Sequence, residues 1–181
     1  MSRINEYFPR NDNAFPQQSV ANVPPMLFRQ ERDWSCSVAC LRTILAAAGV
    51  SCTEEQIIGQ LSMTPGPHYS KDLRKLRLPE GVEAVWGCDE PDITVRKLFD
   101  YMASGYYIMA ETLYNYAHWY VLLGYYVTDC DPNPEHHRIL VYDPYYNEIR
   151  VLNADEFESM WLDGNYAENQ IRKDFVAVRR I

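Results

Sequence analysis

The clearest pattern in the chain lies between Gln30 and Gly49, where apolar residues recur at the spacing of a helix. They follow one another at three- and four-residue steps: Val38, Leu41, Leu45 and Ala48. Asp33 to Ser35 offer side chains that cap a helix N-terminus, and Gly49 suits the position that follows a helix C-terminus. The pattern predicts a buried helix with Cys36 in its first turn.

Other helices are predicted where capping residues precede helical apolar spacing. They are a helix opened by the capping box of Thr53 to Gln56 and running to Leu61, one over 71–76 capped by Ser70, one from Asp92 to Met102 ended by Gly105, and one over 155–161 with Asn153 as cap. Runs of β-branched, aromatic and other apolar residues predict strands over 26–28, 82–86, 106–110, 118–126, 138–142, 148–152 and 175–178. Most of the helices precede most of the strands. This order indicates an α+β fold in which an antiparallel sheet packs against the helix that bears Cys36.

Residues 1–25 differ from the rest of the chain. Asn, Gln and Pro are in excess there, and four prolines exclude a regular helix across the whole segment: Pro9, Pro16, Pro24 and Pro25. We expect an extended arm over 1–25 and a single domain over 26–181, because 181 residues suit one domain with a sizeable core.

Composition and charge exclude several classes of function. With 47% hydrophobic and 13% aromatic residues the chain is globular, and no apolar run reaches the roughly 18 residues that a membrane helix needs. The first residues lack the apolar stretch of a secretory signal, so we expect a cytoplasmic protein, with export by a non-classical route left open. The formal net charge of -8 argues against binding to nucleic acid or to an anionic membrane, because both require a basic face.

The cysteines are odd in number and contain no Cys-x-x-Cys pair: Cys36, Cys40, Cys52, Cys88 and Cys130. This pattern indicates neither a disulfide framework nor a zinc ribbon, and it fits a reducing compartment. Core packing explains Cys40, one helical turn from Cys36, better than a redox or metal pair does. Metal ligands also occur in residues 129–137, where two prolines favour a solvated loop instead: Asp129, Cys130, Asp131, His136 and His137. We predict no metal and no cofactor.

Cys36 is the candidate nucleophile. In the first turn of a helix its thiol faces unpaired backbone N–H groups and the positive end of the helix dipole, and both favour the thiolate that attacks a carbonyl carbon. Gln30 lies six residues upstream, at a distance that a short turn can fold back. Its side-chain amide and the backbone N–H of Cys36 are candidates for binding the oxyanion of a tetrahedral intermediate.

His118 is the candidate base among four histidines. It begins the longest apolar strand, so its ring stands at a strand end and can face the helix start. Asp143 closes the next strand and, if the two strands pair, its carboxylate can reach the ring nitrogen that does not face the thiol. Each residue alone has an ordinary explanation, as a core cysteine, a strand histidine or a turn aspartate. The ordered set of Gln, Cys, His and Asp is far more specific than any one member.

These motifs resemble those of the papain-like cysteine peptidases of family C39, the double-glycine leader peptidases of bacteriocin processing, and their stand-alone relatives. The resemblance covers about residues 26–178, and three stretches carry most of it: Gln30 to Gly49, His118 to Tyr125 and Val141 to Pro144. It implies a papain-like fold with Cys36 as nucleophile and His118 as general base and acid. It also implies Asp143 as the residue that orients His118 and Gln30 as an oxyanion donor.

The sequence departs from the family pattern at Ser37, where the family usually has glycine, and in a longer connection from Tyr125 to Arg138. Trp34, Ser37 and Trp119 are candidate substrate contacts, and the tyrosines between 106 and 146 fit either a peptide groove or packing on the sheet. The leading hypothesis is a cysteine peptidase that cleaves a peptide, or a related acyl or isopeptide bond, in a peptide or protein substrate. Two alternatives stay open: an acyl or peptidyl transferase that uses the same residues, and a catalytically silent peptide- or protein-binding module, which Ser37 favours.

Overall fold

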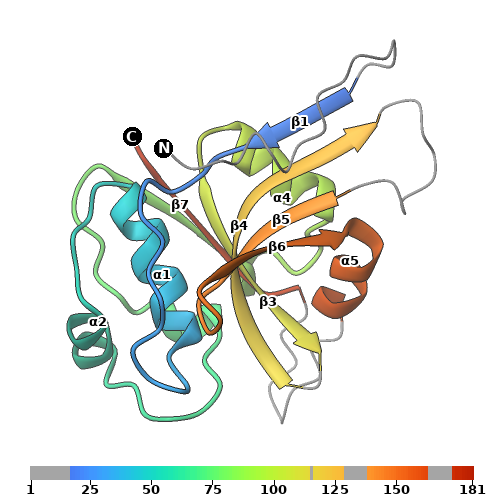
Figure 1. Ribbon diagram of the computed structural model, residues 1–181. Coiled ribbons are helices and arrows are strands. Elements are labelled where there is room, and N and C mark those ends of the chain that lie inside the picture. Colours follow the sequence, from blue (N-terminus) through green and yellow to red (C-terminus); the bar gives the residue numbers. More distant parts are fainter. Residues whose placement is uncertain (1–16, 115, 129–137, 163–172) are drawn as a thin grey trace.

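The computed structural model describes residues 17–114, 116–128, 138–162 and 173–181. Its helices are α1 (Cys36–Ala47), α2 (Glu54–Leu61), α3 (Ser70–Leu73), α4 (Val95–Ala103) and α5 (Ala154–Leu162), with a short 3-10 turn at Gly87–Asp89. Its strands are β1 (Gln17–Ala21), β2 (Val82–Trp86), β3 (Tyr107–Tyr114), β4 (Tyr116–Thr128), β5 (Arg138–Asp143), β6 (Glu148–Asn153) and β7 (Phe175–Arg180). These helices and one antiparallel sheet form the α+β architecture that the sequence predicts (Figure 1).

The seven described strands form one sheet, in which six follow the order β2-β7-β3-β4-β5-β6 and β1 pairs with β4 beside this path. Every pairing is antiparallel. β4 is the longest strand and pairs with three others. β3 pairs with residues 116–122 of β4, β5 pairs with residues 121–126, and β1 pairs with residues 124–128. β1 and β3 therefore lie along the same edge of β4, one after the other, and β5 lies along the opposite edge. The strand that carries His118 is thus fixed at the centre of the sheet.

Helices cover both faces of the sheet, with α1 on one side and α4 and α5 on the other (Figure 1). The core under α1 includes these buried side chains: Val38, Leu41, Ile44, Trp119, Val121, Leu140 and Val176. The opposite core includes Leu98, Phe99, Tyr120, Leu122, Phe157, Trp161 and Phe175. Successive residues of β4 alternate between the two cores, as the two-residue period of a strand requires. The helix that bears Cys36 packs on the sheet, as predicted.

One predicted strand is wrong, and so is the predicted cap of one helix. Residues 26–28 form no strand; the backbone N–H of Phe28 instead donates to Thr43 Oγ1 of α1 at 3.1 Å, so a side chain rather than a neighbouring strand fixes this stretch. Ser70 is the first residue of α3 and not its cap, because its Oγ accepts the N–H of Cys88 at 2.9 Å. That helix also ends at Leu73, earlier than its apolar spacing suggests.

The remaining helices begin and end close to the predicted residues. Thr53 and Gln56 form the predicted capping box, with Thr53 Oγ1 accepting the N–H of Gln56 at 3.2 Å. Gly49 follows α1 with a φ of +83°, a left-handed conformation that glycine adopts without strain. The β3–β4 hairpin is longer than predicted, because cross-strand pairing holds polar residues such as Thr112 opposite His118.

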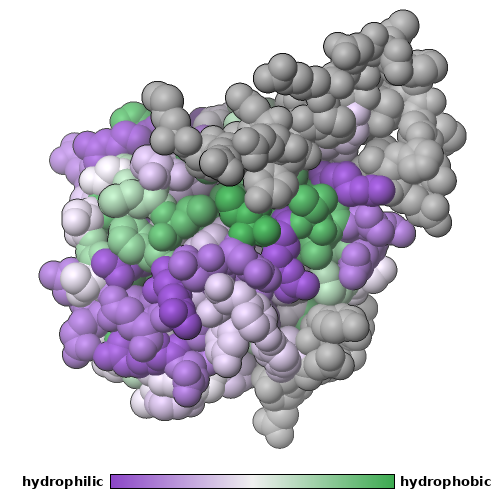
Figure 2. All heavy atoms as spheres, in the orientation of Figure 1, coloured by the Kyte–Doolittle hydropathy of each residue, from purple (hydrophilic) through white to green (hydrophobic). Residues whose placement is uncertain are grey.

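Residues 17–21, within the segment expected to form an arm, are β1 of the sheet. Figure 2 shows hydrophilic residues gathered at the lower left, over α2 and the segment that leads into α1, and a band of hydrophobic residues across the middle of the same face. In the described ranges, no helix combines the length and the apolar character needed to span a membrane.

Candidate active site

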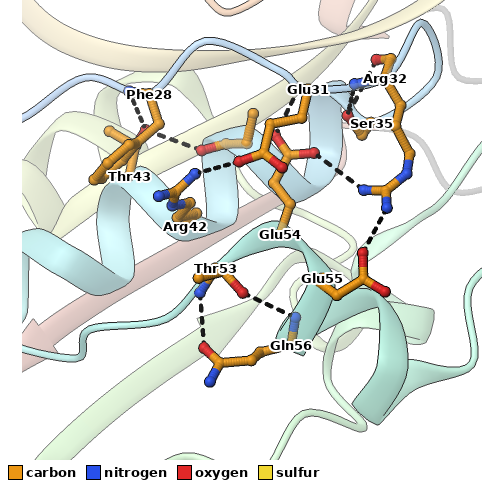
Figure 3. A network of polar contacts seen from close by, with 11 residues as sticks. Phe28, Glu31, Arg32, Ser35, Arg42, Thr43, Thr53, Glu54, Glu55 and Gln56 are labelled. Atoms are coloured by element: carbon orange, nitrogen blue, oxygen red, sulfur yellow. Dashed lines mark hydrogen bonds and ion pairs between the residues drawn. The ribbon is translucent and has the colours of Figure 1, made fainter.

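A buried carboxylate of α2 holds the segment that leads into α1 (Figure 3). Glu54 is fully buried, and its Oε1 accepts the backbone N–H of Glu31 at 3.1 Å. Arg32 reaches over the same helix and pairs with Glu55 at 2.7 Å and with Glu54 Oε2 at 3.9 Å. From the other side, Arg42 of α1 pairs with Glu31 at 2.8 Å. These contacts fix the backbone just before Cys36 against both α1 and α2.

Ser35 occupies the N-cap position of α1, but its side chain does not cap the helix. Its Oγ accepts the N–H of Arg32 at 3.0 Å and donates to the carbonyl oxygen of Arg32 at 3.1 Å. The predicted capping side chain is therefore turned into the preceding loop. The first N–H groups of α1 receive no side-chain cap and remain available to a ligand, at the end of the helix where its dipole favours negative charge.

Gln30 is tied both to this loop and to the turn that follows β5. Its backbone N–H donates to the carbonyl oxygen of Pro144 at 3.1 Å, and its Nε2 donates to the carbonyl oxygen of Arg32 at 2.7 Å. Since an amide nitrogen carries two hydrogens, one N–H of Gln30 remains for a ligand in the pocket that Gln30 lines with Cys36. Pro144 directly follows Asp143, so the candidate oxyanion donor is anchored to the turn of the candidate carboxylate.

β4 and β5 pair, and they bring His118 and Asp143 together. His118 Nε2 lies 2.9 Å from Asp143 Oδ1, and both residues are buried. The same carboxylate oxygen accepts the backbone N–H groups of Tyr145 at 3.0 Å and Tyr146 at 3.4 Å, and Arg150 Nη1 lies 3.5 Å from Oδ2. The turn after β5 thus holds the carboxylate in one orientation toward the imidazole.

Opposing effects set the pKa of His118. Burial lowers it, but hydrogen bonds to Asp143 and Cys36 and the negative charges of both partners raise it to about 9. Burial also raises the pKa of Asp143, yet its hydrogen bond and charge interaction with His118 lower that pKa overall. Because Nε2 is engaged by Asp143, the ring offers its other nitrogen, Nδ1, to Cys36. The imidazole is therefore charged at neutral pH, between a thiol and a carboxylate.

A pocket of about 410 Å³ lies at the start of α1, and its lining includes Gln30, Cys36 and His118. A second pocket of about 470 Å³ adjoins it and shares three of its residues: Tyr116, His118 and Tyr146. Cys36 lines only the first of the two pockets, whereas His118 lines both. His118 therefore stands at the junction of a cleft that continues beyond the thiol.

The three predicted substrate contacts have different surroundings. Trp34 lines the first pocket, and its ring packs against that of His68 with 5.6 Å between centroids. Ser37 lines the same pocket, although it is only 1% exposed, and its Oγ has no hydrogen-bond partner. Trp119 borders the pocket too, but its side chain is buried and its Nε1 donates to the carbonyl oxygen of His68 at 3.0 Å. Trp119 thus belongs mainly to the core.

The other described cysteines do not line the two pockets of the cleft. The four described cysteines are all free thiols, and Cys40 is buried in the core, where burial raises its pKa well above the ordinary value. Cys130, His136 and His137 lie outside the described residues. In the part of the chain that the structure describes, no group of three or more His, Cys, Asp or Glu residues is placed to hold a metal ion.

Two residues of the first pocket escape the sequence-based search: Glu111 and His68. The strand predicted over 106–110 stops one residue before Glu111, and His68 falls in a predicted loop. A single carboxylate directly after an apolar strand run is the signal that could have identified Glu111.

The tyrosines divide between the two interpretations, a peptide groove and packing on the sheet. Tyr116, Tyr145 and Tyr146 are exposed and line the first pocket, whereas Tyr106, Tyr120, Tyr125, Tyr126 and Tyr142 are buried.

Comparison with known proteins bears on the fold. No family model matches the chain, and no curated protein matches it. Among solved structures, the peptidase domain of Streptococcus ComA, a bi-functional ABC transporter involved in a quorum sensing pathway, is similar with a TM-score of 0.55. The alignment covers 84% of this chain and 94% of that one, at 16% sequence identity. The chain therefore has a papain-like α+β fold like that of this peptidase domain.

Proposed function

We propose that the protein is a cysteine peptidase that cleaves a peptide, or a related acyl or isopeptide bond, in a peptide or protein substrate. One observation carries the proposal: the buried imidazole of His118 lies 2.9 Å from the carboxylate of Asp143 and lines one pocket with Cys36, whose thiol also influences the pKa of the ring. A ring held between these groups can exchange a proton with the thiol and then with a leaving group. The similarity of fold to a peptidase domain adds support.

In the first step of the proposed reaction, the thiol proton resides on His118 and the thiolate of Cys36 attacks the substrate carbonyl carbon. The new C–S bond leaves negative charge on the carbonyl oxygen. Backbone N–H groups at the uncapped start of α1 and the second N–H of Gln30 are the donors for this oxyanion. Each such donor is worth a factor of about 100 to 1,000 in rate.

In the second step, His118 gives its proton to the leaving amine, the C–N bond breaks, and the acyl group remains on Cys36 as a thioester. Water then gives a proton to His118 and attacks the thioester, which releases the acid and restores the thiolate and the imidazolium. Asp143 keeps the ring in one orientation and supports its positive charge in both steps. No step requires a cofactor.

Cleavage of a mixed peptide library in ¹⁸O-labelled water tests the proposal, with mass spectrometry identifying the new chain ends. We expect new C-termini that carry ¹⁸O with the wild-type protein, none with Cys36→Ala, and a rate lower by about 100-fold or more with His118→Ala. A parallel reaction with added glycinamide separates the two chemistries, because a transferase forms amide products in place of acids. Absence of any Cys36-dependent product contradicts the proposal.

A further inference from the structure

Several buried polar atoms without a hydrogen-bond partner lie in the wall of the first pocket. Within the described residues these are Gln30 Oε1, Ser37 Oγ, His68 Nδ1 and Glu111 Oε1. Leaving such an atom unpaired costs about 1–3 kcal/mol, so several of them around one pocket indicate a ligand that supplies the missing bonds. Gln30 belongs to the proposed oxyanion site. The other three residues, Ser37, His68 and Glu111, form an acceptor wall that the proposed reaction does not use.

Glu111 supplies the carboxyl group of the acceptor wall. It is 6% exposed, and on β3 it follows Met109 by two residues, so its side chain is on the α1 face of the sheet. It pairs across the hairpin with Trp119, whose Nε1 bonds to the carbonyl oxygen of His68. The sheet therefore holds the Glu111 carboxyl behind the start of α1 and also positions the loop that carries His68.

His68 contributes an acceptor and not a donor. Burial lowers its pKa, which outweighs the raising effects of a hydrogen bond to the backbone of Thr64 and the charge of Asp72, so the ring is neutral near pH 7. A neutral imidazole has one N–H. Because Nδ1 has no partner, the N–H that bonds to Thr64 is on Nε2, and Nδ1 keeps its lone pair for a ligand.

The charges around the acceptor wall favour a cation. Among the described residues that line the first pocket there is no Lys or Arg, whereas the acidic residues Asp33 and Glu111 are present. Burial, the nearby Asp174 carboxylate and Cys36 raise the pKa of Glu111 to about 9, so this carboxyl holds a proton while the pocket is empty. The positive charge of the neighbouring His118 ring is already stabilised by its interactions with Asp143 and Cys36. A cationic ligand would displace the proton of Glu111 into solvent and take its place.

We propose that the acceptor wall is a subsite for a primary ammonium group of the substrate, either a lysine side chain or a free α-amine. An ammonium group has three N–H donors and no acceptor, which matches the three unpartnered acceptor atoms of Ser37, His68 and Glu111. The inference rests on the proposed peptidase function and adds a substrate class to it. Ser37, the departure from the family pattern, then contributes a hydroxyl acceptor beside the nucleophile.

Covalent probes of Cys36 test the subsite without a known substrate. The first arm uses peptidyl acyloxymethyl ketones with blocked N-termini, made as pairs that carry either lysine or acetyl-lysine at one of the two positions nearest the reactive group. The second arm is a pair of norleucine probes that differ only in having a free or an acetylated α-amine. We expect the amine-bearing member of one pair to inactivate the wild-type protein about tenfold faster than its acetylated counterpart, and the arm that shows the difference identifies the source of the ammonium.

Two variants assign the selectivity to the acceptor wall. Glu111→Gln keeps the shape of the side chain but cannot ionise, so we expect the rate ratio to fall to within about threefold of unity. Ser37→Ala removes one acceptor and lowers the ratio partway. Equal rates for both members of every pair in the wild-type protein, or a preference that persists in Glu111→Gln, overturn the inference.

Two further readouts separate failure of the subsite from failure of the peptidase proposal. If iodoacetamide alkylates Cys36 fast and His118→Ala slows that reaction, but both members of every probe pair inactivate the protein equally fast, the subsite is contradicted and the peptidase proposal is not. In Cys36→Ala, calorimetry of n-butylammonium binding at pH 7.5, in buffers of different ionisation enthalpy, reports on the subsite without catalysis. We expect binding with release of about one proton, abolished by Glu111→Gln, because the ammonium group replaces the proton of the carboxyl. No binding in this experiment overturns the inference whatever the alkylation result.

Discussion

The Sγ of Cys40 donates a hydrogen bond to the carbonyl oxygen of Trp119 at 3.3 Å. Cys40 lies one turn after Cys36 on α1, and Trp119 follows His118 on β4. This bond therefore joins the helix of the proposed nucleophile to the strand of the proposed base, directly behind the cleft. The relative position of thiol and imidazole depends on this buried contact as well as on the groups that line the pocket.

Cys40→Ala should lower the free energy of unfolding by about 1–3 kcal/mol, because it removes the buried hydrogen bond and leaves a small cavity. It should also slow alkylation of Cys36 by iodoacetamide, since α1 and β4 lose a buried hydrogen bond that joins them. Urea unfolding and alkylation kinetics measure the two effects. Cys88→Ala is the matched control: Cys88 is only partly buried, and its loss should change stability by at most about 0.5 kcal/mol. Equal effects of the two substitutions contradict the role of Cys40.

Glu54→Ala should destabilise the protein by about 1–3 kcal/mol, because the backbone N–H of Glu31 loses its acceptor. The turnover number should fall more than the apparent affinity for substrate, since the loop before α1 carries the proposed oxyanion donor. Glu55→Ala is the control, as Glu55 contacts the same Arg32 from an exposed position and should matter by less than about 1 kcal/mol. Identical losses of stability in both variants contradict a special role for the buried carboxylate.

NMR titration of the imidazole should show His118 titrating near pH 9, above its ordinary value, because Asp143 and Cys36 stabilise the charged ring. Peptide cleavage should then decline above about pH 9, where the ring can no longer protonate the leaving amine. Asp143→Asn removes the carboxylate charge and should lower both midpoints by about one unit or more. Titration of His118 at its ordinary pKa in the wild-type protein contradicts the proposed pairing.

Glu111→Gln should stabilise the protein at alkaline pH. The pKa of Glu111 is raised in the folded state, from the ordinary 4.5 to about 9, so the folded protein holds a proton that the unfolded chain releases between these values. Its contribution to stability is present below pH 4.5 and is lost as the pH rises toward 9. Urea unfolding at pH 5 and pH 8 should show the variant gaining on the wild type as the pH rises. A constant difference between the two proteins across this range contradicts a buried, protonated Glu111.

The α+β class, the helix that bears Cys36 and the strands β4 and β5 could all be predicted from sequence, because each depends on local signals, whereas the pairing of β4 with β5 remained a condition. Periodic apolar residues define α1, and continuous apolar runs define the two strands. The capping box at Thr53 was predicted correctly for the same reason, since both of its hydrogen bonds lie within four residues. His118 lies near the start of β4 and Asp143 ends β5, so antiparallel pairing of the two strands brings these residues to the same edge.

Long-range contacts account for what the sequence did not predict. Serine commonly caps a helix, but the hydroxyl of Ser35 forms hydrogen bonds with the backbone of Arg32 instead. The position of Arg32 is in turn set by its ion pairs with α2. Residues 26–28 have strand composition, yet their partner is a helix side chain, Thr43. Glu111 lies directly after an apolar run that ends a predicted strand, and only the packing of β3 on α1 brings it to the wall of the pocket. Its importance depends on burial, which composition does not encode.

The rate of Cys36 alkylation by iodoacetamide as a function of pH tests the central claim most directly, in the wild-type protein and in His118→Ala. An ordinary thiol is only a few per cent thiolate at pH 7, and a neighbouring imidazolium favours the thiolate, which is the form that reacts. We predict that Cys36 reacts at pH 7 about tenfold or more faster than an ordinary thiol, and that His118→Ala removes this advantage. A rate at pH 7 equal to that of an ordinary thiol, unchanged by His118→Ala, would contradict the assignment of Cys36 and His118 as a catalytic pair.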